Sequence, residues 1–329
     1  MAWSDLMWLA LGIVLLTTGG ETVVRGAAAL ARRLGVSPLV IGLTVVAFGT
    51  SAPELAVNLI AAVQDQGAIS FGNIFGSNMA NIGLIVGCTA ILRPIVITDV
   101  VIRRELPMML LATAGALAMG FDNALSAGGN LPSFPDFYTR SDGILLLMFF
   151  LVFLYYTVGD FVRQRAEGEA NGKPVESEGP LWKSLVLTLL GLALLVGGAE
   201  VTVGAAVNLA RALGVSEELI GLPLIAVGTS LPELVASVAA TVRGQAELAI
   251  GNVVGSNVFN LLLVMGCTSI VRPVPVPPGG HMDLMVVAGL SLVLFAVSVS
   301  HRREIVRTEA CVLLAVYLGY LGWRSGIGF

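Results

Sequence analysis

The most constraining feature of this chain is a proline next to a glutamate inside a long apolar segment, residues 39–63. The local sequence is Gly-Thr-Ser-Ala-Pro-Glu at residues 49–54, and Gly-Thr-Ser-Leu-Pro-Glu follows at residues 228–233. Inside a membrane helix, a carboxylate is costly to bury and a proline removes a backbone hydrogen bond. We therefore interpret the two segments as broken helices that form the two halves of one ion site.

The composition predicts an integral membrane protein. Of the 329 residues, 56% are hydrophobic and 12% are charged, and that charged share is about half the value of a typical soluble protein. A helix needs about 20 apolar residues to cross a bilayer. We therefore expect an all-α polytopic membrane protein without a nucleic-acid-binding face or an evident obligate protein partner. The ten expected transmembrane spans are residues 6–31, 38–63, 69–92, 104–121, 142–162, 182–210, 217–242, 247–271, 283–300 and 304–323.

The two halves of the chain repeat each other. A shift of 179 residues aligns residues 19–94 with the second half without a gap, so that Glu54 meets Glu233. Because each repeat has an odd number of spans, the second enters the membrane from the opposite side, an arrangement typical of secondary transporters. We expect a first five-helix repeat at residues 1–162, a cytoplasmic linker at 163–181 and a second repeat at 182–329, with the most similar segments at about 38–92 and 217–271.

Lysine and arginine are concentrated in one set of loops. If both termini lie outside, thirteen of these residues fall in inner loops and four in outer loops. Cytoplasmic loops carry an excess of Lys and Arg in membrane proteins. We therefore expect a bacterial inner membrane protein whose two termini are both extracytoplasmic.

Each broken helix is expected to gather hard oxygen atoms. Pro53 has no N–H, and its ring crowds the carbonyl of Gly49, which loses its helical partner. A freed carbonyl at membrane depth faces protein, water or an ion. Thr50 lies one turn from Glu54, on the same helix face. Carbonyl, hydroxyl and carboxylate oxygens suit Ca²⁺ and other hard cations.

The helix after each broken helix adds further polar groups. Ser77 and Asn81 are four residues apart and share a face, as do Ser256 and Asn260. Two interpretations apply to these four residues. They are ligands or near-ligands of the ion, which we favour, or they are polar contacts that hold membrane helices together.

Four other polar residues have open roles. Asn73 and Asn252 are expected to cap or bridge the broken helices across the two halves. Glu21 and Glu200 either line a cation path or lie at a helix interface. Glu21 has Arg25 one turn further on, whereas Glu200 has a glycine at that position.

The charge of the site constrains its cargo. Two ionised carboxylates carry a charge of about −2, and an empty site with this charge would be very costly in hydrocarbon. We therefore expect the site to hold one divalent cation, two monovalent cations or protons. Competition among these occupants is the physical basis of antiport, and alternating access moves one group of helices against the other.

Two rival functions are less consistent with the residues. A serine hydrolase needs a base such as His or Lys near the nucleophile. The expected spans contain no His, and Lys183, the one Lys among them, lies at the first turn of its span, away from the broken helices. His281 and His301 fall in expected loops and are predicted to be solvated. A channel would need a continuous path, whereas broken helices around a central site favour alternating access.

The paired segments resemble the two alpha-repeats of the calcium/cation antiporter superfamily, in particular those of prokaryotic sodium/calcium exchangers. The resemblance rests on residues 42–55 with 72–81 and on 221–234 with 251–260, and it extends over nearly the whole chain. It implies a secondary transporter rather than an enzyme, with transported Ca²⁺ and Na⁺ as its only bound ions and no cofactor. The binding oxygens that the resemblance implies belong to Thr50, Ser51, Glu54, Ser77, Asn81, Thr229, Ser230, Glu233, Ser256 and Asn260.

One position departs from the family pattern. Prokaryotic sodium/calcium exchangers often carry Asp where this chain has Asn260, and potassium-dependent relatives carry acids at the places of Asn81 and Asn260. Potassium coupling is therefore not expected here. Proton/calcium relatives have a Gly-Asn-Ala-Thr-Glu type of motif, so the Gly-Thr-Ser-x-Pro-Glu form favours Na⁺. The resemblance thus implies Ca²⁺ extrusion in exchange for Na⁺, with Ca²⁺/H⁺ antiport on the same site as the alternative.

Overall fold

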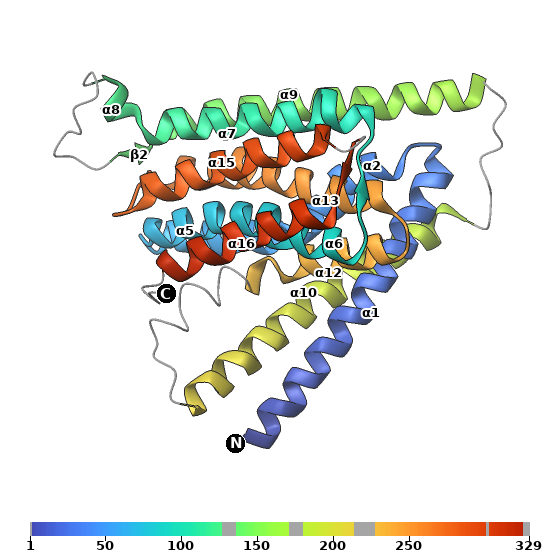
Figure 1. Ribbon diagram of the computed structural model, residues 1–329, viewed down its shortest axis with the longest axis horizontal. Helices are drawn as coiled ribbons and strands as arrows, with labels where there is room; N and C mark the ends of the chain where they lie inside the picture. The colour runs from blue at the N-terminus through green and yellow to red at the C-terminus, as the bar shows by residue number, and fades with distance from the viewer. Residues whose placement is uncertain (1, 127–135, 171–179, 214–227, 301–302, 325–329) are drawn as a thin grey trace.

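The computed structural model describes residues 2–126, 136–170, 180–213, 228–300 and 303–324, and these residues are mostly helical (Figure 1). We label π-helical segments η. The helices of the first half are α1 (Ala2–Leu34), α2 (Pro38–Ile41), η1 (Gly42–Val46), α3 (Ala47–Thr50), α4 (Ala52–Val63), α5 (Gly67–Met79), η2 (Ala80–Val86), α6 (Gly87–Leu92), η3 (Val101–Glu105), α7 (Leu106–Gly120), α8 (Asp122–Ser126) and α9 (Arg140–Ala170).

The second half repeats this order where it is described. Its helices are α10 (Leu181–Ala212), α12 (Leu231–Val242), α13 (Ala246–Val258), η4 (Phe259–Val264), α14 (Met265–Val271), α15 (Gly280–Val299) and α16 (Arg307–Arg324). The described loops between helices contain four two-residue strands: β1 (Ile95–Val96), β2 (Phe137–Tyr138), β3 (Val274–Pro275) and β4 (Glu304–Ile305).

The expected all-helical membrane architecture is confirmed, whereas the count of ten spans stays a prediction. Six described helices are long and apolar enough to cross a membrane, or seven if residues 38–50 and 52–63 form one bent span. The expected span at 217–242 lies partly outside the described residues. The spans expected at 104–121 and 304–323 correspond to α7, which has 15 residues, and to α16, which carries charges at both ends.

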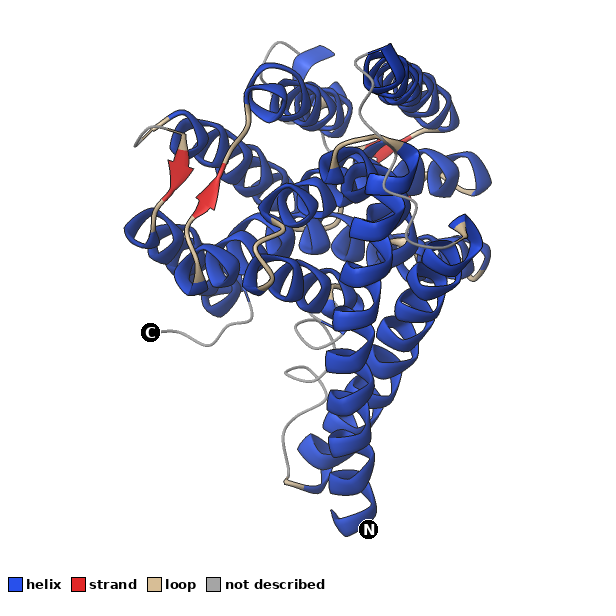
Figure 2. Cartoon of the chain, turned by 90° about the vertical axis from the view of Figure 1, so that its right-hand side faces the viewer, coloured by secondary structure: helices blue, strands red, loops and turns tan. Residues whose placement is uncertain are grey.

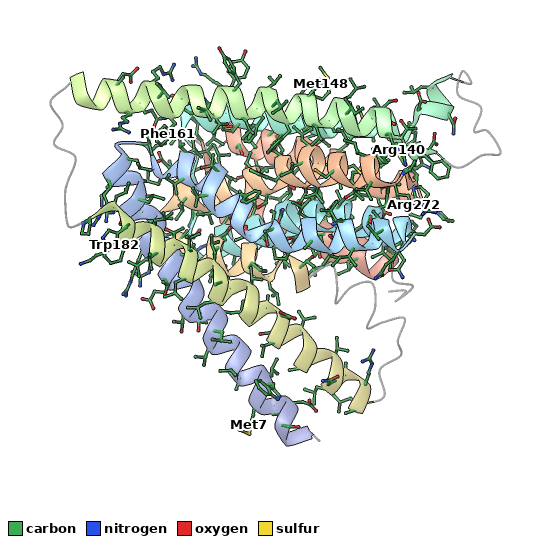
Figure 3. The ribbon with its side chains drawn as sticks, turned by 180° about the vertical axis from the view of Figure 1, so that it is seen from behind. Met7, Arg140, Met148, Phe161, Trp182 and Arg272 are labelled. Carbon is green, nitrogen blue, oxygen red and sulfur yellow. The ribbon has the colours of Figure 1, made fainter. Side chains whose placement is uncertain are left out.

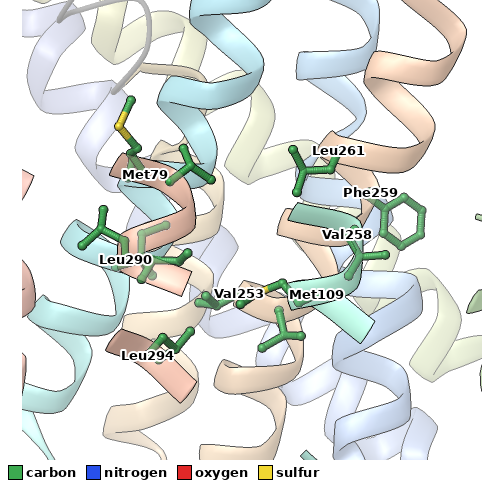
Figure 4. Close-up of a cluster of buried hydrophobic side chains, with 14 of the residues drawn as sticks. Met79, Met109, Val253, Val258, Phe259, Leu261, Leu290 and Leu294 are labelled. Carbon is green, nitrogen blue, oxygen red and sulfur yellow. The ribbon is translucent and has the colours of Figure 1, made fainter. Parts of the chain in front are cut away.

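The central helices are buried among the others, and the outer helices present apolar faces outward. In the most apolar 18-residue part of Ala246–Val271, 94% of the residues are buried, against 28% in the corresponding part of Arg140–Glu167 of α9. Figure 4 shows part of the core, where α7, α13 and α15 contribute Met109, Val253 and Leu290. A fully apolar exposed face such as that of α9 is stable only against lipid or another protein.

α1 and α10 form an antiparallel pair that crosses the other helices obliquely and projects from the body (Figures 1 and 2). Glycines bring the two backbones close. A Cβ added to Gly191 would lie 2.3 Å from the Val23 nitrogen, and one added to Gly198 would lie 2.8 Å from the Leu16 nitrogen. Small residues allow this close packing between membrane helices.

The loops gather at two opposite ends of the helices. At one end β1 pairs with β4 in antiparallel fashion, and Arg303 pairs with Asp99 at 2.5 Å. At the other end β2 pairs with β3, and Arg272 pairs with Asp65 at 2.6 Å. We call these the β1–β4 end and the β2–β3 end.

Figure 3 shows the same division, with Arg140 and Arg272 at one end and Phe161 and Trp182 at the other. Among the described residues, the paired loop segments that the alternating spans assign to one side of the membrane therefore lie at one end of the molecule. The β1–β4 end carries the loops expected in the cytoplasm. The membrane face of each end, and hence the position of the termini, stays a prediction.

Two local expectations change. The first part of the expected linker is helical, since α9 continues to Ala170. Within this extension Arg163 forms ion pairs along the helix with Asp160 and Glu167. The prediction that His281 lies in a solvated loop was wrong, because it belongs to a helix and its side chain is only 31% exposed. His281 lies in the first turn of α15 and contacts buried Asp136 at 2.8 Å. His301 lies outside the described residues.

Candidate cation-binding site

The predicted helix break is present in the first half. Residues 38–50 and 52–63 form two helical pieces that meet at an angle of 41°. Ser51 lies at the break with φ −87° and ψ 2°, and Pro53 lies in the first turn of α4. Backbone N–H groups in a first turn have no acceptor within the helix, so a proline there removes no helical hydrogen bond. Ser230 has the same backbone angles before α12, which contains Pro232 in its first turn. The prolines therefore begin new helices at matching positions.

Each new helix carries one of the two carboxylates in its first turn. Glu54 on α4 is 0% exposed and Glu233 on α12 is 1% exposed. The two carboxylates occupy matching positions of the repeat, 179 residues apart. The first turn of a helix favours a carboxylate because its unpaired backbone N–H groups carry a partial positive charge. This partial charge is too small to neutralise the full negative charges of the two carboxylates.

The carboxylate oxygens are incompletely paired. Ser51 Oγ donates a hydrogen bond to Glu233 Oε1 at 3.0 Å. Among the described residues, Glu233 Oε2 and both oxygens of Glu54 accept no hydrogen bond. A buried charge is stable only when it is paired or coordinates a cation. A cation or a proton would therefore satisfy these three oxygens.

Two asparagines bridge the halves, as the sequence predicted. Thr50 Oγ1 donates a hydrogen bond to Asn252 Oδ1 at 3.2 Å. In the symmetric place, Asn73 Nδ2 donates to Thr229 Oγ1 at 3.1 Å. Each bridge connects the hydroxyl at one helix break to the helix that follows the other break. Both bridges hold a candidate ligand hydroxyl in position beside the carboxylates.

A supporting pair of residues was not anticipated from the sequence. Asn58 Nδ2 donates both to the Glu54 carbonyl and to Asn73 Oδ1, each at 2.7 Å. On the other side, Asn252 Nδ2 donates to Ser237 Oγ at 2.9 Å. Asn58 and Ser237 occupy matching positions, four residues after each glutamate. A polar residue on the same helix face as the glutamate was the signal that could have revealed them.

The candidate asparagines of the next helices lie in π-helical segments. Asn81 is the second residue of η2 and Asn260 is the second residue of η4. Their side chains are buried, and among the described residues neither amide group has a hydrogen-bond partner. π-helical turns are rare and occur frequently at functional sites. The sequence contained no signal for these two turns, because they depend on the packing of neighbouring helices.

The serines one turn before these asparagines, Ser77 and Ser256, are also buried. Ser77 Oγ lies 3.5 Å from Thr229 Oγ1, so this contact also joins the two halves. The hydroxyls of Ser230 and Ser256 have no hydrogen-bond partner among the described residues. Thr229 is partly buried, and the other nine candidate residues are at most 3% exposed.

The chemistry of this centre is that of oxygen ligands. Among the described residues, no group of three or more His, Cys, Asp or Glu could hold a metal ion. The candidate ligands predicted from the sequence are two carboxylates together with hydroxyl and amide oxygens. This ligand set matches hard cations such as Ca²⁺ and Na⁺ and provides no soft ligand for transition metals.

Comparisons with known proteins agree with this chemistry. The family model described as sodium/calcium exchanger protein matches residues 4–159 and 183–326. A putative antiporter of Alkalimonas amylolytica, CaxA, is 38% identical over 95% of this chain and 96% of its own length. The inner membrane protein YrbG of Escherichia coli is 33% identical, with 97% of each chain covered.

An archaeal relative and a solved structure extend the likeness. The sodium/calcium exchanger MaX1 of Methanosarcina acetivorans is 34% identical over 95% of this chain and 96% of its own. A structure of the sodium-calcium exchanger NCX_Mj superposes with a TM-score of 0.82 at 32% identity, covering 98% of this chain and 99% of the other. The buried oxygen site and these matches lead to one conclusion: the chain belongs to the sodium/calcium exchanger family of membrane transporters.

Proposed function

We propose that the protein is a secondary antiporter that extrudes Ca²⁺ in exchange for Na⁺ by alternating access. The observation that carries the proposal is the pair of buried carboxylates, Glu54 and Glu233, with three oxygens that lack hydrogen-bond partners among the described residues. One Ca²⁺ or two Na⁺ neutralise this pair equally well. An empty, charged site would resist crossing the membrane, and this resistance couples the two ion flows.

We propose that ten side chains line the ion site. The carboxylates supply the charge, the hydroxyls at the helix breaks complete the shell, and the asparagines of the π-helical segments lie next to it. Support comes from their burial and from the contacts that join them across the two halves. The set is Thr50, Ser51, Glu54, Ser77, Asn81, Thr229, Ser230, Glu233, Ser256 and Asn260.

The direct test is Ca²⁺ uptake by reconstituted protein. Proteoliposomes loaded with Na⁺ are diluted into Na⁺-free buffer that contains labelled Ca²⁺. The expected result is uptake that requires internal Na⁺, saturates with external Ca²⁺ and stops when the Na⁺ gradient is collapsed. Uptake that continues without any counter-ion on the opposite side would indicate a channel and would contradict the proposal.

Ca²⁺/H⁺ antiport is a second candidate, and one observation favours it. The unpartnered oxygens of Glu54 and Glu233 are acceptors that protons neutralise as completely as Na⁺ does. The same vesicles, prepared without Na⁺ and with an acidic interior, separate the two candidates. Ca²⁺ uptake that follows the pH gradient and ignores Na⁺ would establish the proton-coupled alternative.

The inner membrane, with both termini outside the cytoplasm, is the proposed location. The prevalence of Lys and Arg in the loops of the β1–β4 end supports this orientation. A cysteine placed in the loop at residues 97–99 should then react with membrane-impermeant maleimide only after the cells are opened. Labelling of intact cells would reverse the orientation without affecting the antiport proposal.

A further inference from the structure

The helices that carry the two glutamates are covered differently. α12 runs from Glu233 toward the β1–β4 end, where Gly244 lies against Arg93. α4 runs from Glu54 toward the β2–β3 end, where Gly67 lies against Pro275. The two helices occupy matching positions in the repeat, so the coverage of their outer faces can be compared residue by residue.

α1 packs closely against α12. A Cβ added to Gly20 would lie 2.9 Å from Val235 Cγ1 and 3.3 Å from Ala239 Cβ. Both residues of α12 are therefore partly buried. The matching residues of α4 are exposed: Ala56 faces outward and the side chain of Ile60 is 56% exposed. α10, the counterpart of α1, makes no comparable packing against α4 among the described residues.

An ion pair lies beside this contact. Glu21, the residue after Gly20, accepts from the guanidinium of Arg243, which ends α12. Glu21 Oε1 also lies 2.7 Å from Arg25, one turn along α1. The carboxylate therefore joins α1 directly to the end of the helix that begins with Glu233.

The other half lacks this pair. The repeat places Glu200 on α10 where α1 has Glu21, and it places Gln64 at the end of α4 where α12 has Arg243. Gln64 and Arg243 end their helices with nearly the same backbone angles, φ −85° and −81°. A glutamine offers no charge to Glu200, so only one of the two symmetric positions can form an ion pair.

We propose that Glu21 and Arg243 form a latch that holds α1 against α12 and keeps the β1–β4 end of the ion path closed. The structure is the latched state, in which no described helix packs over Ala56 and Ile60 on the outer face of α4. In the opposite state α1 leaves α12, the ion pair breaks, and α10 covers α4 without an equivalent pair. The latch therefore favours access from the β2–β3 end when the transporter rests.

The proposal rests on the antiport function, because alternating access requires two such states. Its expected size is modest. Both side chains are partly exposed, at 48% for Glu21 and 36% for Arg243, and an exposed ion pair shifts a two-state equilibrium by about two- to fivefold. Glu21 and Arg243 are thus positioning residues, and neither of them contacts the proposed ion.

The test measures docking of α1 on α12 in the reconstituted full chain. Cys88, Cys267 and Cys311 are replaced by alanine, and Gly20→Cys is combined with Ala239→Cys. Their Cβ atoms fall near the separation that a disulfide requires. The initial rate of oxidative cross-linking then reports the fraction of molecules in which α1 is docked.

We expect Arg243→Gln and Glu21→Gln each to lower the cross-linking rate by about two- to fivefold. Arg303→Gln, the same chemical change in the separate ion pair with Asp99 at the same end, should leave the rate unchanged. The charge swap Glu21→Arg with Arg243→Glu should restore it. An unchanged rate in Arg243→Gln, or a swap that cross-links as slowly as the single variants, would overturn the latch.

A second measurement avoids the added bulk at Gly20. A single Val235→Cys is covered by α1 in the latched state, and its alkylation by a water-soluble maleimide should become about two- to fivefold faster when Arg243→Gln is added. Equal alkylation rates would contradict the latch. Both readouts are made without transport, so a failure of Na⁺ coupling in the flux assay leaves this test intact.

Discussion

The two halves of this transporter are nearly identical at the proposed ion site and different at its edges. Ser51 and Ser230 share their backbone angles, and each half sends one asparagine to a hydroxyl of the other. Outside this centre, only the second half ends its glutamate-bearing helix with an arginine that meets α1. In the proposed mechanism, the symmetric centre holds the same ion in both states, whereas the edges distinguish one state from the other.

The symmetry is also incomplete within the centre. Ser51 donates to Glu233, whereas the hydroxyl of the matching Ser230 has no hydrogen-bond partner among the described residues. The two carboxylates are thus chemically alike and differently supported. Equal effects of matching substitutions would favour the symmetric description, and unequal effects would locate the difference.

The largest expected effect is the loss of a carboxylate. Glu54→Gln and Glu233→Gln each remove half of the site charge, so each should lower Na⁺-driven Ca²⁺ uptake by about a hundredfold or more, equivalent to about 2.7 kcal/mol. Glu247→Gln, the same change on a partly buried residue of α13, is the matched control and should transport normally. Retained transport in either site variant, with the folded state verified by circular dichroism, would refute the two-carboxylate site.

The asparagine bridges should come next. Asn73→Ala and Asn252→Ala each leave a buried partner unsatisfied, which costs about 2 kcal/mol, or about thirtyfold in apparent Ca²⁺ affinity. The concentration of Ca²⁺ that gives half-maximal uptake checks this value. If one variant shifts and the other does not, the bridges are not equivalent despite their matching geometry.

A smaller effect is expected from a third charge in the centre. Asn260→Asp adds a carboxylate to a buried position, so a second cation should bind more tightly beside it. We expect the Na⁺ concentration that half-inhibits Ca²⁺ uptake to fall about tenfold, or 1.4 kcal/mol. Asn81→Asp makes the same change at the matching position of the first half, and we expect a similar fall in that Na⁺ concentration. An unchanged Na⁺ dependence in both variants would remove these two residues from the ion site.

The smallest expected effect compares the two serines at the helix breaks. Ser51→Ala removes a candidate ligand oxygen and the hydrogen bond to Glu233, whereas Ser230→Ala removes only the oxygen. The Ca²⁺ affinity of Ser51→Ala should therefore be lower than that of Ser230→Ala by about fivefold, which corresponds to a hydrogen bond of about 1 kcal/mol. Equal affinities would show that this hydrogen bond does not persist when the ion is bound.

Much of the site was predictable because its causes are local. Pro53 lacks an N–H in any surroundings, so a break before α4 followed from the covalent structure. The exact repeat of this motif around Pro232 indicated a matching half, and the bridging role of Asn73 and Asn252 was confirmed. The same reasoning failed for His281, because its partner Asp136 is distant in sequence and is brought near by the pairing of β2 with β3.

By itself, the sequence determined that the protein is a helical membrane transporter with two broken helices, each carrying hydroxyls and one glutamate. Composition, proline and repeat spacing are sufficient for this, because each acts within a few residues. Only the tertiary structure decided that Ser51 supports Glu233, that Asn81 and Asn260 lie in π-helical turns, and that Arg243 meets Glu21. These contacts join segments that lie far apart in the chain, and their geometry depends on how whole helices pack against one another.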